Sequence, residues 1–165
     1  MSYMIGGLRM PGSFGVRLTS AAPSNGTDEV QTLTVTASGG TYRLSFEGFW
    51  TAPLAVGSAA AAIQAALTAL PSVGAGGIAV TGAGPFTLTF GGNLARKAVS
   101  TIGVDASQAT GGTVTVVETT PGVDATHRGA PAGGLLLDIG STTKRLFINT
   151  GTPLVPIWTV VGTQT

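Results

Sequence analysis

The sequence has no cysteine and few charged residues. The absence of cysteine excludes disulfide bonds and thiol chemistry. Charged residues make up 9% of the 165 residues and the formal net charge is +1, whereas an ordinary soluble protein has about 25% charged residues. No charged side chain occurs between Gly48 and Ala95. A free monomer normally covers its surface with charged side chains. We therefore expect much of the surface of this protein to contact other protein, and not nucleic acid or a membrane.

The sequence is also poor in metal-binding and membrane signals. Its single histidine, His127, cannot build a multi-histidine metal site, and no loop places oxygen ligands at alternate positions as a calcium site requires. We therefore expect no metal and no cofactor. No apolar run approaches the roughly 20 residues that span a bilayer. The first twenty residues lack the apolar centre of a signal peptide, so we expect synthesis in a cytoplasm.

What the sequence does contain is short stretches of alternating polarity, which predict strands. Residues 29–47 alternate in this way on both sides of "SGG" (38–40), which predicts a hairpin with a tight turn. Further strands are expected at 77–82, 85–92, 99–106 and 111–120. In several of these strands, threonines share one face and large apolar residues the other.

One segment follows a helical period instead. "SAAAAIQAALTALP" carries apolar residues at spacings of three and four, begins with Ser58 as the expected N-cap and ends at Pro71. The order β-β-α-β-β-β predicts an α+β fold that is mostly β, with one antiparallel sheet and an Ala-rich helix across one face.

Composition divides the chain into four parts. Residues 1–27 are an N-terminal arm without a clear period, and 28–120 are the α+β body. Residues 121–134, rich in Gly and Pro, are a linker. Residues 135–165 read as β-hairpins, a C-terminal segment too small to bury its own apolar residues, so we expect it to dock or oligomerise.

The stretch "DIGSTTK" (138–144) is similar to the first phosphate loop of the sugar-kinase, actin and Hsp70-like ATPases. In that family hundreds of residues with a second phosphate loop follow, whereas here only 21 residues follow Lys144. We therefore interpret Asp138 as the end of a strand, Gly140 and Ser141 as the turn, and Lys144-Arg145 as the start of the next strand.

No other pattern favours catalysis. A Ser-His-Asp site would need His127, which lies in the Gly/Pro linker where a base is poorly held in place. The acidic residues are scattered, apart from the adjacent Asp28 and Glu29. Phe49-Trp50 is the one candidate for an exposed aromatic platform; because neighbours in a strand face opposite ways, we expect one ring in the core and the other in an interface. The sequence therefore predicts a protein that is not an enzyme.

Two segments resemble phage structural proteins. The hairpin, "TAPLA", the helix "AAIQAALTALP", "GAGGIAVTG" and "PFTLTF" resemble a module of structural proteins of tailed phages that infect actinobacteria. The end of the chain, with "FINTGT" (147–152) and Trp158, resembles a C-terminal segment of head decoration and fibre-like proteins, where a "YINTGT…PTW" pattern recurs. Phe147 stands where that pattern has tyrosine.

The resemblance implies a capsid decoration protein that is assembled in the host cytoplasm and lies on the virion capsid surface. Its expected partners are the major capsid protein and copies of itself, with a trimer favoured. A tail or fibre component that binds host glycans is the alternative. We expect the interface to include seven apolar residues: Phe14, Phe49, Trp50, Leu146, Phe147, Ile148 and Trp158.

Overall fold

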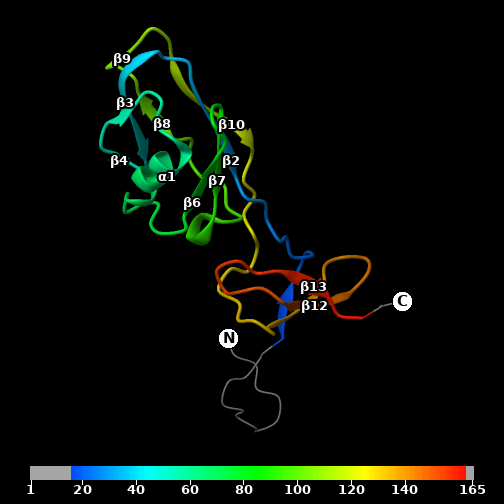
Figure 1. The fold of residues 1–165 in the computed structure, drawn as a ribbon. Helices are drawn as coiled ribbons and strands as arrows, with labels where there is room; N and C mark the ends of the chain where they lie inside the picture. The colour runs from blue at the N-terminus through cyan, green and yellow to red at the C-terminus, as the bar shows by residue number, and fades with distance from the viewer. Residues whose placement is uncertain (1–15, 163–165) are drawn as a thin grey trace.

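The computed structural model describes residues 16–162 and has two lobes, a larger body and a smaller tail (Figure 1). The protein is mostly β with one short α-helix, which confirms the predicted fold class. The strands form three sheets, two in the body and one in the tail. Residues 1–15, which include Phe14 of the predicted interface, lie outside the described residues.

The first body sheet is antiparallel and has the order β10-β2-β7-β6. Its strands are β2 (Val30–Val35), β6 (Ile78–Thr81), β7 (Phe86–Phe90) and β10 (Val114–Thr120). The sequence alternation is reproduced here: Leu33, Leu88 and Phe90 are fully buried, whereas the threonines face outward.

The second body sheet is built around one long strand, β3 (Gly39–Phe46), with four short strands paired to it antiparallel. These are β4 (Phe49–Trp50), β5 (Leu54–Ala55), β8 (Gly103–Asp105) and β9 (Ala109–Thr110). Tyr42, Leu44 and Phe46 alternate into the core, and the rings of Phe46 and Phe90 lie 5.4 Å apart, which joins the two sheets.

The predicted hairpin of β2 and β3 is wrong, because the two strands belong to different sheets. Residues 36–40 bend the chain from one sheet into the other while 108–113 follows alongside: Thr36 N donates to Thr113 O and Ser38 N to Thr110 O. Gly40, with φ +85°, makes this corner possible, since a Cβ there would lie 2.0 Å from Gln108 O. "SGG" is therefore a bend in a continuous strand, a known role of glycine in β-structure.

The helix α1 (Ala60–Thr68) covers the inner side of the body near β6 and buries Ile63 and Leu67 completely. The predicted N-cap is wrong: Ala59 occupies that position, and Ser58 Oγ instead donates to Ala55 O at 2.8 Å. A short 3₁₀ helix, η1 (Gly92–Leu94), follows β7. Neither helix is long and apolar enough to cross a bilayer.

A buried polar pair fastens the loop before β8 to β2. Glu29 and Gln31 are almost fully buried. The Gln31 amide donates to Glu29 Oε1 and to Ser100 O, and its oxygen accepts from Ile102 N at 2.9 Å. Since a buried polar group without a partner is costly, these bonds fix where residues 99–102 lie.

The tail sheet has the order β1-β11-β12-β13. Its strands are β1 (Arg17–Thr19), β11 (Leu135–Asp138), β12 (Arg145–Asn149) and β13 (Trp158–Val160). The last three were expected from the sequence. The strand β1 was not expected, because three residues carry too little pattern; it pairs parallel with β11.

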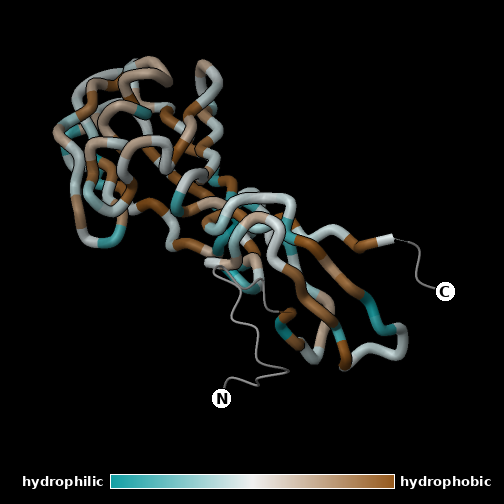
Figure 2. Tube along the Cα trace, turned by 90° about the horizontal axis from the view of Figure 1, so that it is seen from below, coloured by the Kyte–Doolittle hydropathy of each residue, from teal (hydrophilic) through white to brown (hydrophobic). Residues whose placement is uncertain are grey.

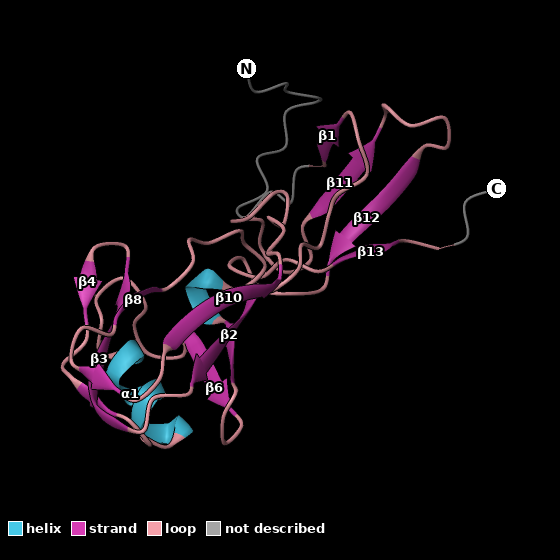
Figure 3. Cartoon of the chain, turned by 90° about the horizontal axis from the view of Figure 1, so that it is seen from above, coloured by secondary structure: helices cyan, strands magenta, loops and turns pink. Residues whose placement is uncertain are grey.

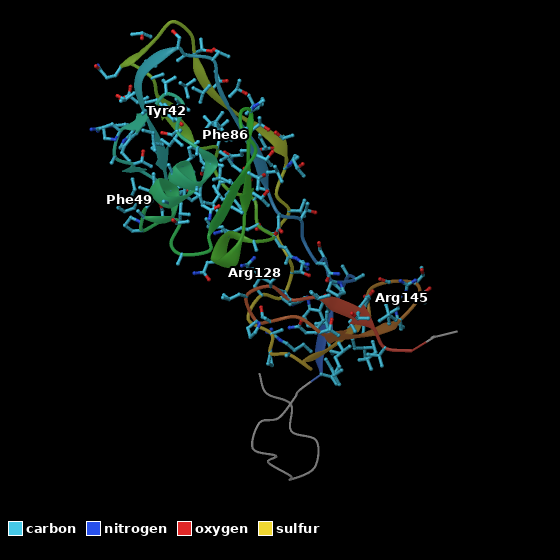
Figure 4. The ribbon with its side chains drawn as sticks, in the orientation of Figure 1. Tyr42, Phe49, Phe86, Arg128 and Arg145 are labelled. Atoms are coloured by element: carbon cyan, nitrogen blue, oxygen red, sulfur yellow. The ribbon has the colours of Figure 1, made fainter. Side chains whose placement is uncertain are left out.

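Two arginines join the lobes through backbone carbonyls. Figure 4 shows Arg128 between body and tail, where its Nη1 donates to Ala95 O at 2.6 Å. Arg96 Nη1 donates to Asn25 O and to Pro156 O, which joins the segment before β2 to the tail loop between β12 and β13. Trp158 N also donates to Asn25 Oδ1 at 2.6 Å, so polar groups hold this junction.

Candidate interaction surfaces

The β3–β4 hairpin carries two exposed aromatic side chains at its tip. Its turn, Glu47-Gly48, has positive φ at both residues, as a tight two-residue hairpin requires. Phe49 is 48% exposed and Trp50 is 50% exposed, and Figure 4 places Phe49 at the periphery of the body. The expectation that one ring would be core is wrong, because the tip extends past Phe46, the last buried residue of β3.

The turn beneath these rings is held in place. Ser100 Oγ donates to Glu47 Oε1 at 2.7 Å, and Ser100 O accepts from the buried Gln31 amide at 3.1 Å. The two aromatic rings therefore stand on a fixed hairpin, an arrangement that can anchor a protein contact at low entropic cost.

The outer face of the first body sheet is broad and has no charged side chain. The strand register places nine small or uncharged residues on it: Val30, Thr32, Thr34, Ala79, Thr81, Thr87, Thr89, Thr115 and Val117. Val117 is 61% exposed. Thr32 and Thr119 hydroxyls lie 2.6 Å apart, so some hydroxyls pair with each other. We call these nine residues the threonine face.

A hollow of about 420 Å³ opens at the N-terminus of α1. Its walls are Val35, Val56, Ala60, Phe86 and small residues of the 82–84 turn. No ionisable side chain lines it, so this hollow supplies neither a general acid nor a general base.

The "DIGSTTK" stretch forms a closed turn, as interpreted from the sequence. Asp138 ends β11 and is fully buried, and its carboxylate accepts from Gly140 N, Ser141 N and Ser141 Oγ. Lys144 Nζ donates to Ile139 O and Ser141 O. The hydrogen bond from Ser141 Oγ is the main cause that holds the Asp138 pKa below its ordinary value, opposed by burial. The charged groups that a phosphate loop would offer to a nucleotide are thus used within the turn.

His127 lies against the tail. Its ring meets Trp158 edge to face, with centroids 6.0 Å apart. Within residues 16–162 no group of three His, Asp or Glu side chains gathers as a metal site would need.

The tail residues proposed for an interface fall on two sides of the sheet. Phe147 and Trp158 are each 6% exposed and form the tail core with Ala130 and Leu136. The Trp158 indole donates to Thr126 O, so residues of the linker cover this side. Leu146 and Ile148 lie on the opposite side by strand alternation and are partly exposed.

Other residues on that opposite side were not expected from the sequence. Leu18, Leu135 and Leu137 share it by register. The signal was present in "LLL" and "LFI": strands with apolar residues at consecutive positions are covered on both faces, whereas an alternating strand is covered on one.

Comparisons with known proteins give a partial likeness in fold. No protein-family model matches the sequence, and no curated protein matches it. The chain is similar to a solved chain of Mycobacterium phage Patience, with a TM-score of 0.44 and 18% sequence identity. The match covers 84% of this chain and 57% of that chain, so this protein spans little more than half of it. A likeness of this degree carries no argument about function.

Proposed function

We propose that this protein is a structural protein of a tailed-phage virion, a decoration protein that binds the outer surface of the major capsid lattice and stabilises the head. It is assembled in the host cytoplasm and acts by binding, without catalysis or a cofactor. The resemblance of its sequence motifs to phage structural proteins supports this proposal, and so does the chemistry of its surface.

The observation that carries the proposal is the threonine face. Burying a charge in an interface costs several kcal/mol unless the charge is paired, and this face has none to bury. Its hydroxyls both donate and accept hydrogen bonds, so they adapt to the backbone and side-chain groups of a protein surface. The aromatic tip formed by Phe49 and Trp50 adds the large rings that dominate binding energy in many interfaces.

A protein that binds a repeating capsid lattice gains affinity when it binds as an oligomer. We propose that the protein binds as a homo-oligomer, with a trimer favoured. An oligomer that engages several capsid subunits at once gains avidity, because each later contact is intramolecular.

The proposal is tested by binding to purified heads that lack the protein. The wild type is expected to sediment with heads and to raise their thermal stability. Val117→Glu places a carboxylate in the threonine face and is expected to weaken binding by about 10-fold or more, since an unpaired charge would be buried. The matched control is Ala65→Glu, an exposed position on α1 away from that face. Equal binding of both variants, or no binding by the wild type, would contradict the proposal.

One observation favours the alternative, a tail or fibre protein that binds host glycans. Phe49 and Trp50 are adjacent and half exposed, next to a turn that the Ser100–Glu47 hydrogen bond holds, and sugars stack on exposed aromatic rings. Saturable binding to host envelopes that is lost in Phe49→Ala/Trp50→Ala and kept in Phe49→Tyr/Trp50→Phe would support it. Binding to heads without binding to envelopes would exclude it.

A further inference from the structure

Within residues 16–162, the tail sheet has one side that the linker covers and one side that is only partly covered: Leu18 is exposed there, and Leu135, Leu137, Leu146 and Ile148 are half-buried. The register Leu18↔Leu137↔Leu146 and Leu135↔Ile148 places five aliphatic residues on the same side. We call these five residues the open tail face. The opposite side holds Leu136, Phe147 and Trp158, which the linker covers.

Charge is distributed between the two sides in an unusual way. The charged residues of these strands, Arg17, Asp138 and Arg145, all lie by the same register on the side of Leu136 and Phe147, where Asp138 is buried and the two arginines are exposed. The open tail face keeps no charge, and Leu18 on it is 64% exposed. A soluble sheet normally shows the reverse, with polar residues outward.

No helix or strand of the body forms a second layer over this face. The body elements lie at the other end of the molecule (Figure 3), and Figure 2 shows apolar residues along the tail strands. Stable folds pack at least two layers around a core. The tail sheet, with a core of four residues on its other side, therefore gains a layer when this face is covered.

We infer that the open tail face packs against the same face of further copies of this chain. The inference deepens the proposed oligomer of the proposed function by naming its surface. Two such faces are self-complementary: neither brings a charge, and among the strand positions on this side only Thr159 has a hydrogen-bonding side chain. Interfaces between identical subunits are more apolar than other interfaces, as this one would be.

The size of the face fits an interface core. Four strands about 4.8 Å apart and about four residues long give roughly 250 Å², whereas a standard interface buries about 800 Å² on each partner. The remaining area comes from the loops beside the sheet, where Ile139 is 46% exposed and Leu154 is 55% exposed. The face therefore supplies the dry centre, and these loops supply the rim.

The test is the molar mass of the full-length protein by light scattering, with two matched variants. The wild type is expected to exceed the mass of one chain. Leu18→Glu adds a charge at a position exposed enough to leave the subunit folded, and is expected to weaken self-association by about 100-fold. Val117→Glu adds the same charge at a similarly exposed strand position in the body and is expected to leave the mass unchanged. Leu18→Ile is expected to retain the wild-type mass.

Two results would overturn the inference. A wild type of single-chain mass at high concentration is the first, and an oligomer that Leu18→Glu leaves intact is the second. If the wild type is a single chain, the Leu18→Glu variant shows what covers the face instead: lost binding to heads would mean that the capsid does, and a lowered melting temperature would mean that part of the same chain does.

The inference and the proposed function can fail separately. An oligomer sensitive to Leu18→Glu that never binds heads leaves the inference standing and refutes the decoration role. A wild type that is a single chain and binds heads refutes the inference and leaves the decoration role standing.

Discussion

At the scale of single residues, the structure depends on polar groups that are buried and fully used. Gln31 and Asp138 illustrate this: each is fully buried, and each ties a loop to a strand end. The sequence placed Asp138 at the strand end before the turn but did not show that its carboxylate is buried, and the role of Gln31 was not visible at all. Gln31 stands at a position that alternation assigns to one face of a strand, and nothing local in the sequence indicates that its partners lie about seventy residues away.

Replacing Gln31 by Ala is expected to lower the free energy of unfolding by about 3 kcal/mol, because Glu29 Oε1, Ser100 O and Ile102 N lose the hydrogen bonds that Gln31 makes. Urea unfolding of the full chain measures this. The control is Gln108→Ala at an exposed position, expected within about 0.5 kcal/mol of the wild type. Similar losses in the two variants would contradict the role given to Gln31.

Asp138 makes stability depend on pH in a defined direction. Its folded-state pKa is lowered, first by the Ser141 hydroxyl. Its contribution is therefore fully present above the ordinary carboxyl pKa, about 4, and is lost as the pH falls through the lower folded value. Asp138→Asn is expected to reduce the loss of stability on acidification, measured as melting temperature against pH.

Some loss of stability on acidification is expected to remain in the Asp138→Asn variant. Asp105, whose pKa is also lowered, mainly by the Ser107 backbone N–H, still contributes. Asp124→Asn, at an exposed position, is the control. If its pH profile matched that of Asp138→Asn, the closed turn would not be the cause.

At the scale of elements, most strands and the helix could be predicted, because period-two alternation and the Ala-rich run are local properties. Which strands pair in which sheet could not be predicted. Residues 29–47 read as a hairpin, since "SGG" permits a reversal as readily as a bend. The bend is chosen by residues 103–120, which pair with β2 along its length and with residues 39–40 and 43–45 of β3.

The bend at residues 36–40, between β2 and β3, gives a prediction for which a second glycine serves as the control. Gly40 and Gly57 both have φ near +90°, yet a Cβ at Gly40 would meet Gln108 O and one at Gly57 would meet nothing within 4 Å. Gly57→Ala is expected to cost about 1 kcal/mol from backbone strain, and Gly40→Ala at least about 3 kcal/mol because the strand must also move. Urea unfolding measures both; equal costs would mean that the corner is not tightly packed.

At the scale of the whole molecule, the two lobes offer different surfaces. The body presents the threonine face and the aromatic tip, and the tail presents the open tail face. The aromatic tip was identified from the sequence, although the expected burial of one ring was wrong. The open tail face was found only in part, through Leu146 and Ile148, because Leu18 reaches it from the far end of the chain by a pairing that no local pattern reveals.

That pairing has a consequence for how the molecule is put together. The tail sheet is built from both ends of the described chain, and the whole body is inserted between β1 and β11. The chain enters and leaves the body side by side, where Thr27 and Val123 bridge (Figure 1). Such adjacent ends are the arrangement at which domains tolerate insertion and exchange. A different domain with neighbouring termini could be grafted at this point, and the tail would present it in place of the present body.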